Sequence, residues 1–318
     1  MDAAATGAET GVDWDNAFTS WMHAVNSLPA IINHNVVILV RDGTYSETVI
    51  IQRTVAAGTI TIRGEYYWYG TNASSKTGKF DVNAADPMYA DRAQIQAGDI
   101  VWATKWAGTV LSSVPSESII DTVALVSGAE VTLTTNSAKE FDATWTYQIV
   151  KTEIAASSGN AILLERYSRA IVNGLKISGN SAIRTHLNSE INVACCYISP
   201  TAEYASGLYL YGRGAGEPYF MPYRSIFVGG TTNTYGILST SGSFAYPSRC
   251  VFSNLAEAIR SSQSSTVVTS GIHIMSDVVI GLKCLSGISL ISSTNLLNEG
   301  STPINPASNP GTDGSYIL

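Results

Sequence analysis

The chain has 318 residues, of which 45% are hydrophobic and only 14% charged, and its net charge is −7. Soluble domains usually carry about 25% charged residues, so this chain can bury a large core under an uncharged polar surface. The negative balance argues against a nucleic-acid-binding protein. Because the sequence has no apolar run of membrane-spanning length and no signal-peptide pattern at its start, we expect neither membrane insertion nor export.

Charge and tryptophan divide the sequence into two unlike halves. Residues 1–157 have a net charge of −8 and contain all six Trp, whereas residues 158–318 have a net charge of +1. Four cysteines are too few for a disulfide scaffold, and no C-x-x-C pair is present. We therefore expect no metal site and no cofactor.

The first predicted element is an amphipathic helix over residues 13–28, with Asp13 as its N-cap and Pro29 just beyond its end. Its apolar face comprises Trp14, Phe18, Met22, Val25 and Leu28, at spacings of three or four. We expect residues 1–30 to form an N-terminal arm and a capping helix.

Residues 31–71 predict short strands. Val36 to Val40 is a continuous apolar run, Asp42-Gly43 marks a turn, and two further strands are expected at 48–51 and 59–62. This helix–strand–DGTY–strand–strand order resembles the opening of right-handed parallel β-helix proteins, the pectin-lyase-like superfamily. The resemblance implies a solenoid whose open end the helix covers.

Residues 72–157 interrupt this rhythm. Segments such as AEVTLTTN and WTYQIVKTEI alternate apolar and polar residues between glycine-containing turns, as antiparallel strands do. We predict an inserted antiparallel β domain.

From residue 158 to 300 two landmarks repeat with a period in the low twenties, which is typical of one β-helix coil. A tiny residue followed by an aliphatic one opens each coil, at Ala161-Ile162, Ala182-Ile183, Gly207-Leu208, Gly236-Ile237, Ala258-Ile259 and Gly281-Leu282. An apolar-x-apolar phrase closes it, at Leu175–Ile177, Cys196–Ile198, Ile226–Val228, Cys250–Phe252 and Ile272–Ile274. The predicted fold is therefore an all-β, right-handed parallel β-helix, followed by a C-terminal strap at 301–318 whose SYIL end caps the last coil or reaches a neighbouring subunit.

Cys196 and Cys250 occupy the same predicted slot two coils apart. At about 9.6 Å they are beyond disulfide reach, so we expect buried free thiols. His273 alternates with apolar neighbours and should face outward.

The superfamily includes pectate lyases, polygalacturonases and the tailspikes and tail fibres of bacteriophages, but the catalytic phrases NTD, GHG and RIK are absent. A glycosidase needs two carboxylates about 5–9.5 Å apart. Glu203 and Glu217 are the only candidates that we retain, and solvated loop charges are the favoured interpretation. We expect a non-enzymatic protein, with a polysaccharide depolymerase (lyase or glycoside hydrolase) as the alternative.

The candidate binding site is an aromatic and basic set on the longest coil, 208–236, together with Tyr204 just upstream: Tyr204, Tyr209, Tyr211, Arg213, Tyr219, Tyr223 and Arg224. Such residues suit either a contact between protomers or stacking on sugar rings, and simple loop packing is the third interpretation.

These features favour a structural, receptor-binding or glycan-binding component of a phage virion, such as a tail fibre, a tailspike-like protein or a head-decorating protein. The resemblance implies a homotrimer in contact with other virion proteins, and a cell-surface glycan is a possible partner. A bacterial adhesin is disfavoured because no export signal is visible.

Overall fold

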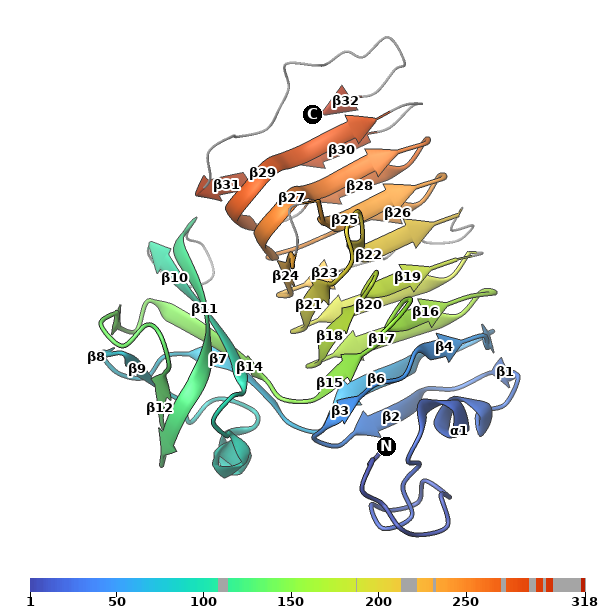
Figure 1. Cartoon of the computed structure of the whole chain (residues 1–318), viewed down its shortest axis with the longest axis horizontal. Coiled ribbons are helices and arrows are strands. Elements are labelled where there is room, and N and C mark those ends of the chain that lie inside the picture. Colours follow the sequence, from blue (N-terminus) through green and yellow to red (C-terminus); the bar gives the residue numbers. More distant parts are fainter. Residues whose placement is uncertain are drawn as a thin grey trace.

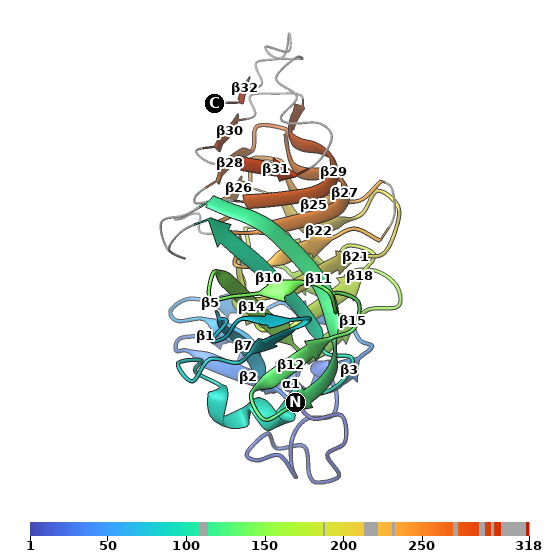
Figure 2. The same cartoon turned by 90° about the vertical axis from the view of Figure 1, so that its left-hand side faces the viewer.

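The computed structural model describes residues 1–107, 114–186, 188–212, 222–230, 233–269, 273–285, 290–293, 296–299 and 316–317. It is a parallel β-helix of about ten turns with an antiparallel sheet beside it (Figures 1 and 2). The predicted fold class is confirmed.

The first face of the solenoid carries the coil openings. Its strands are β4 (Val49–Ile51), β16 (Ile162–Leu164), β19 (Ile183–Thr185), β22 (Ser206–Tyr211), β25 (Tyr235–Thr240) and the later parts of β27 (Val251–Ser262) and β29 (His273–Leu285). In parallel register they align Ile162, Ile183, Leu208, Ile237, Ile259 and Leu282. All six are fully buried, so the predicted ladder of openings is confirmed.

The second face begins with β2 (Val36–Val40), β6 (Ile60–Gly64), β17 (Arg169–Asn173), β20 (Glu190–Ala194) and β23 (Pro222–Tyr223). A separate parallel sheet follows in later coils, made of β26 (Phe244–Ala245), β28 (Thr266–Thr269), β30 (Leu290–Ser293) and β32 (Tyr316–Ile317). Because β32 pairs with β30, the end of the chain adds to the last coil of its own solenoid. Residues 301–315 and 318 of the predicted strap lie outside the described residues.

The third face carries the coil closings on β3 (Thr44–Tyr45), β15 (Glu153–Ala155), β18 (Lys176–Gly179), β21 (Tyr197–Pro200), β24 (Ile226–Val228), the first parts of β27 and β29, and β31 (Leu296–Glu299). The register aligns Ile177, Ile198, Phe227, Phe252 and Met275. The predicted alignment of Val228 and Ile274 with this column was wrong by one residue. Ile226 faces outward yet is fully buried, because the antiparallel sheet covers it, and this hides the alternation.

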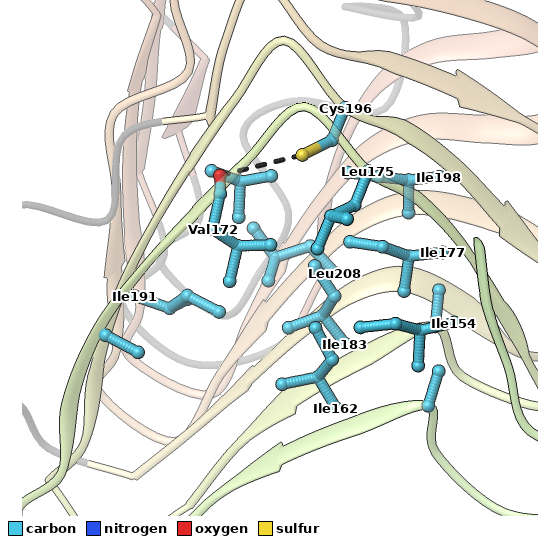
Figure 3. Close-up of a cluster of buried hydrophobic side chains, with 14 of the residues drawn as sticks. Ile154, Ile162, Val172, Leu175, Ile177, Ile183, Ile191, Cys196, Ile198 and Leu208 are labelled. Carbon is cyan, nitrogen blue, oxygen red and sulfur yellow. Dashed lines mark hydrogen bonds between the residues drawn. The ribbon is translucent and has the colours of Figure 1, made fainter. Parts of the chain in front are cut away.

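Aliphatic side chains from all three faces fill the interior (Figure 3). In the later coils the fill becomes aromatic, and the rings of Phe227 and Phe252 stack with centroids 5.1 Å apart. This explains why two of the three glycine openings, at Gly207 and Gly236, carry no side chain. A Cβ on Gly207 would lie 2.7 Å from Phe227 Cδ1, and one on Gly236 would lie 2.6 Å from Phe252 Cδ1.

Cys196 and Cys250 do share one slot, with Ser225 in the coil between them. Both thiols are buried and neither forms a disulfide, and burial raises the pKa of each to about 12. Cys196 Sγ contacts the Val172 carbonyl oxygen at 3.6 Å (Figure 3). The prediction of buried thiols without a disulfide is confirmed, whereas the His273 side chain lies outside the described residues.

The N-terminal helix is shorter than predicted. Helix α1 spans Trp21–Asn26, and its N-cap is Ser20, whose side chain accepts from the His23 N–H. Asp13 instead caps a local turn, where its carboxylate accepts from the backbone and side chain of Asn16. Segment 9–19 is held as a loop by Glu9, which accepts from the Thr19 N–H at 3.0 Å. The helix lies at the first coil, where it contacts β4 (Figure 1).

A six-stranded antiparallel sheet interrupts one coil between β6 and β15. Its strand order is β7 (Tyr67–Thr71), β14 (Trp145–Val150), β10 (Ile100–Ala107), β11 (Val114–Ser127), β12 (Glu130–Leu133) and β9 (Lys79–Asp81). Alongside it are η1 (Tyr89–Gln94) and the short pair β8 (Lys76–Thr77) and β13 (Glu140–Phe141). Its core is rich in aromatic residues, because five large rings pack among eight aliphatic side chains: Trp68, Phe80, Phe141, Trp145 and Tyr147.

We call residues 67–150 the inserted sheet. Its first strand starts before the predicted boundary at 72, and Glu153–Ala155 already pairs with the β-helix before the predicted boundary at 157. The division of the chain into domains at these boundaries remains a prediction.

The inserted sheet packs against the third face of the β-helix. Trp102 and Val150 form one apolar cluster with Ile226 and Val251 of the coils. At the junction the buried ammonium of Lys151 lies 2.7 Å from Asp42 Oδ2 and donates to the Gln94 carbonyl at 2.6 Å. Figure 2 shows β10 and β11 crossing in front of the coils.

Candidate functional site

A cleft of about 360 Å³ lies where the inserted sheet meets the β-helix. We call it the insert cleft. From the inserted sheet it is lined by β7, by residues 83–87 and by parts of β10 and β14; from the β-helix it is lined by Arg224, Ser225, Arg249, Cys250 and Val251. It is therefore built from segments far apart in the sequence.

The β-helix wall is a stack of corners between the second and third faces. Gly174, Cys195, Arg224 and Arg249 occupy this corner in four successive coils, and all have a left-handed backbone with φ between 46° and 63°. Successive coils are linked through it, because the Cys195 N–H donates to the Tyr223 carbonyl and the Arg224 N–H to the Ser248 carbonyl. The last two corners therefore place two arginine side chains on the cleft wall.

Gln148 of β14 connects the two walls. Its carboxamide nitrogen donates to the Arg224 carbonyl at 2.9 Å, and its oxygen accepts from Trp102 Nε1 at 3.2 Å, in the orientation that satisfies both groups. Trp102 is itself buried between the inserted sheet and the coils. The backbone of the Arg224 corner is thus held by the inserted sheet.

Aromatic rings flank the arginine side chains. The Arg224 guanidinium carbon lies 5.2 Å from the centroid of the Tyr223 ring and 5.9 Å from that of Tyr69. Arg249 donates to the Tyr223 hydroxyl over a long 3.5 Å contact. Tyr69 and Tyr223 are half-buried, so parts of their rings remain accessible to a ligand.

Asp86 is the one carboxylate among the described residues that line the insert cleft. It accepts hydrogen bonds from the backbone N–H groups of Tyr69 and Met88 and from the Tyr147 hydroxyl, at 2.8–3.0 Å. Burial raises the pKa of this carboxyl group. Its oxygens therefore organise the inserted sheet, and the cleft offers mainly donors and aromatic faces to a ligand.

The residues of the predicted binding set lie on different surfaces. Tyr209 and Tyr211 are on the outward side of β22, where Arg184 lies 4.8 Å over the Tyr209 ring and His186 stacks on Tyr211 at 4.7 Å. We call these four residues the first-face strip. Tyr204 is exposed at the corner before β22. Arg224 lines the insert cleft, and Tyr223 lies beside it in contact with the Arg224 guanidinium. Arg213, Glu217, Tyr219 and Phe220 lie outside the described residues.

The described glutamates of the coils have separate partners. Glu203 accepts from the Asn233 side chain at 2.7 Å, Glu165 accepts from Gln52 at 2.6 Å, and Glu190 pairs with Arg169 at 2.7 Å. Across the described ranges, no group of three or more His, Cys, Asp and Glu side chains is arranged to hold a metal ion. The same ranges contain no helix with the length and apolarity that a bilayer span requires.

Sequence reasoning missed most of the insert cleft. Arg249 had a detectable signal, because it immediately precedes the coil closing Cys250–Phe252. Arg224 has a similar place in the preceding coil, where it is followed by Ser225 and the closing Ile226–Val228. The contributions of Tyr69, Asp86 and Gln148 had none, since they depend on how the inserted sheet packs on the coils.

No protein-family model and no curated protein matches the chain. Among solved structures it is similar to the tailspike protein gp49 from Pseudomonas phage LKA1, at 11% identity and a TM-score of 0.28, over 85% of this chain and 60% of that one. A second is the tailspike gp61 of Pseudomonas phage phi297, at 14% identity and a TM-score of 0.22, over 95% and 66%.

A third is the gp54 tailspike of Acinetobacter baumannii bacteriophage AP22, in complex with A. baumannii capsular saccharide. It is 10% identical with a TM-score of 0.23, over 89% of this chain and 73% of that one. The chain thus spans 60–73% of the length of these structures. All three are phage tailspike proteins with low identity to this chain.

Proposed function

We propose that the chain is a non-catalytic, glycan-binding β-helix component of a phage tail, and that the insert cleft is its glycan site. The observation that carries the proposal is a concave site lined by Tyr69, Arg224 and Arg249. The half-buried Tyr223 lies beside this site and contacts both arginines. Sugar rings offer apolar faces for stacking and hydroxyls that accept from such donors.

The placement in a virion rests on the fold and the surface. The parallel β-helix, the 14% charged fraction and the uncharged polar surface suit a rigid protein that works outside the cell. The inserted sheet adds a wall beside the coils, and a solenoid with a lateral wall can hold an extended polymer along its axis.

The absence of catalysis is proposed from the carboxylates. Hydrolysis needs an acid and a second carboxylate across the scissile bond. Of the described lining residues only Asp86 is acidic, and its oxygens already accept three hydrogen bonds. Glu203 does not line the cleft and accepts from Asn233 instead. Because Glu217 lies outside the described residues, a polysaccharide depolymerase is kept as the second candidate function.

We further propose that the chain assembles as a homotrimer through the first-face strip. On this outward surface the half-buried Leu238 pairs with Tyr209, and the half-buried Leu163 pairs with Arg184 on the other side of the strip. Tyrosine and arginine are enriched at protein interfaces. Light scattering on the pure protein should give three times the monomer mass, and a clean monomer would contradict the trimer.

The glycan site is tested by titrating purified protein with capsular and lipopolysaccharide-derived oligosaccharides. Removing the ring from Tyr69 or Tyr223 should weaken binding at least tenfold, because each stacked ring contributes about 1.5 kcal/mol. Tyr204→Ala, at an exposed corner outside the cleft, is the matched control and should bind normally. The proposal fails if the wild-type protein binds no glycan, and release of new reducing ends or unsaturated sugars would establish the depolymerase instead.

A further inference from the structure

We propose that Arg224 and Arg249 form a carboxylate-binding subsite, so that the insert cleft selects acidic glycans containing uronic or other carboxylated sugars. The inference rests on the proposed glycan-binding function and adds to it the chemical class of the ligand. It concerns one pair of residues in one slot of the solenoid, and it can fail while the glycan site stands.

The first support is the geometry of the pair. Both arginines are at the same corner of adjacent coils, and the hydrogen bond from the Arg224 N–H to the Ser248 carbonyl joins these coils directly. Adjacent parallel strands lie about 4.8 Å apart, so the two side chains leave the backbone at that separation. Two guanidinium groups on side chains that start this close together can reach both oxygens of one carboxylate.

The second support is their charge environment. Elsewhere Arg41, Arg169 and Arg260 each pair with a carboxylate at less than 3.0 Å. Within the part of the chain that the structure describes, no carboxylate lies within 4.0 Å of the Arg224 or Arg249 side-chain nitrogens. Two neighbouring positive charges repel each other in a partly enclosed site, and a bound anion would relieve this repulsion.

The third support is the contrast with the earlier corners of the same stack. At Gly174 a Cβ would lie 2.3 Å from the Tyr67 ring, so this corner is sealed by the inserted sheet. At Cys195 the thiol is buried and its pKa is raised to about 11 by that burial. The corner therefore changes from sealed and uncharged to open and basic as it reaches the cleft.

The fourth support is preorganisation. Gln148 holds the backbone of Arg224, while Tyr223 contacts both arginines through its ring and its hydroxyl. Donors that are already in place lose less conformational entropy when they bind an anion. Tyr69 and Tyr223 would stack on the sugar that carries the carboxylate.

The test measures binding of matched oligosaccharides by calorimetry. The probes are galacturonate, glucuronate and sialate oligomers, and for each the same oligomer with its carboxylates reduced to alcohols. We expect the wild-type protein to bind at least one acidic probe tenfold or more tightly than its reduced counterpart, with a preference that falls as salt rises from 50 to 300 mM. Arg224→Gln and Arg249→Gln should each remove most of this preference.

Arg166→Gln is the matched control, because Arg166 also has a left-handed backbone, with a φ of 58°, but is exposed and does not line the cleft. It should retain the preference. Thermal melts of both cleft variants identify any that fails to fold, and Arg249→Lys gives a second reading, since it keeps the charge but loses the planar fork.

The possible outcomes separate the two proposals. Equal binding of acidic and reduced probes, unaffected by either cleft variant, overturns the carboxylate subsite and leaves the glycan site intact. The subsite is also overturned if inorganic sulfate or phosphate binds as tightly as the acidic oligomer and competes with it, because the arginine pair would then be a general anion site. Failure of every acidic and neutral glycan to bind removes the proposed function itself.

Discussion

The β-helix and the inserted sheet solve the same problem of core formation with different side chains. The interior of the coils is a ladder of mainly aliphatic residues that recur from coil to coil, with the phenylalanine pair in the later coils. The core of the inserted sheet adds five large rings to its aliphatic residues, with Phe80 stacked on Tyr147 at 4.9 Å and Phe141 packed on Trp145 at 4.8 Å. A ladder spreads stability over many equivalent steps, whereas the aromatic cluster concentrates it in a few residues.

The largest expected effect comes from breaking the aromatic cluster. Trp145→Ala should lower the free energy of unfolding of the inserted sheet by about 3–5 kcal/mol, because it empties a large volume in a fully buried site. Hydrogen exchange should accelerate across β7, β10 and β14 and stay slow in the coils. Leu125→Ala, at an exposed position of β11, is the control and should change stability by less than about 0.5 kcal/mol. Equal acceleration in the coils would mean that the two regions unfold as one unit.

The next effect tests the junction between the two regions. Lys151→Met removes the ammonium that lies 2.7 Å from Asp42 and leaves that carboxylate without its counter-ion. Because the Lys151 side chain is buried but that of Asp42 is 28% exposed, the loss should be about 1–3 kcal/mol, measured by urea unfolding. Lys139→Met, in the partly exposed pair with Glu117, should cost less than about 1 kcal/mol. Equal losses in the two variants would show that Lys151 has no special role at the junction.

A smaller effect tests the ladder. Gly207→Ala places a methyl group against Phe227, which should cost about 1–3 kcal/mol through overpacking. Phe227→Leu in the same chain should recover part of this loss, and a double-mutant cycle measures the coupling. The matched control is Ala182→Gly, because Ala182 aligns with Gly207 in the preceding coil. In that coil the position of Phe227 is taken by Ile198, so the methyl group of Ala182 is accommodated. Additive effects at Gly207 and Phe227 would contradict the proposed packing.

The same contrast explains what could be predicted from sequence. The openings were found because Ile162, Ile183 and Leu208 follow a tiny residue in each coil and face a continuous core. The closing at Ile226 was shifted because this residue is apolar on the outward side, where the inserted sheet covers it. Contacts between coils are periodic in sequence, but the packing of the inserted sheet is not.

The candidate site divided in the same way. The tyrosines of LYLY were correctly placed on the outward side of a coil, because strand alternation decides which side a residue faces. The association of Arg224 with Tyr69 and Gln148 was not predictable, because it joins residues more than 70 positions apart without a shared period. The start of the helix was also missed, because Trp14 and Phe18 continue the apolar spacing of α1 although they lie in a loop.

The smallest effect uses pH to separate the two regions. Burial raises the pKa of Asp99, at the turn before β10, to about 6. Its protonated form therefore stabilises the folded state at low pH, and this stabilisation is lost as pH rises from about 4 through 6. Asp99→Asn should remove this dependence and raise stability at pH 7.5 relative to the wild type, by about 1 kcal/mol after allowance for the partial exposure of the group. Urea unfolding at pH 4.5 and 7.5 measures both effects.

Asp142 provides the control with the opposite sign. Hydrogen bonds from Thr144 lower the pKa of its carboxyl group, so its stabilisation is present at neutral pH and is lost as pH falls through the folded-state pKa. Asp142→Asn should therefore weaken the inserted sheet at pH 7.5, where Asp99→Asn strengthens it. Both residues belong to the inserted sheet, so hydrogen exchange in the coils should not respond to either change. A pH-dependent response in the coils would show that the junction at Lys151 transmits charge changes from one region to the other.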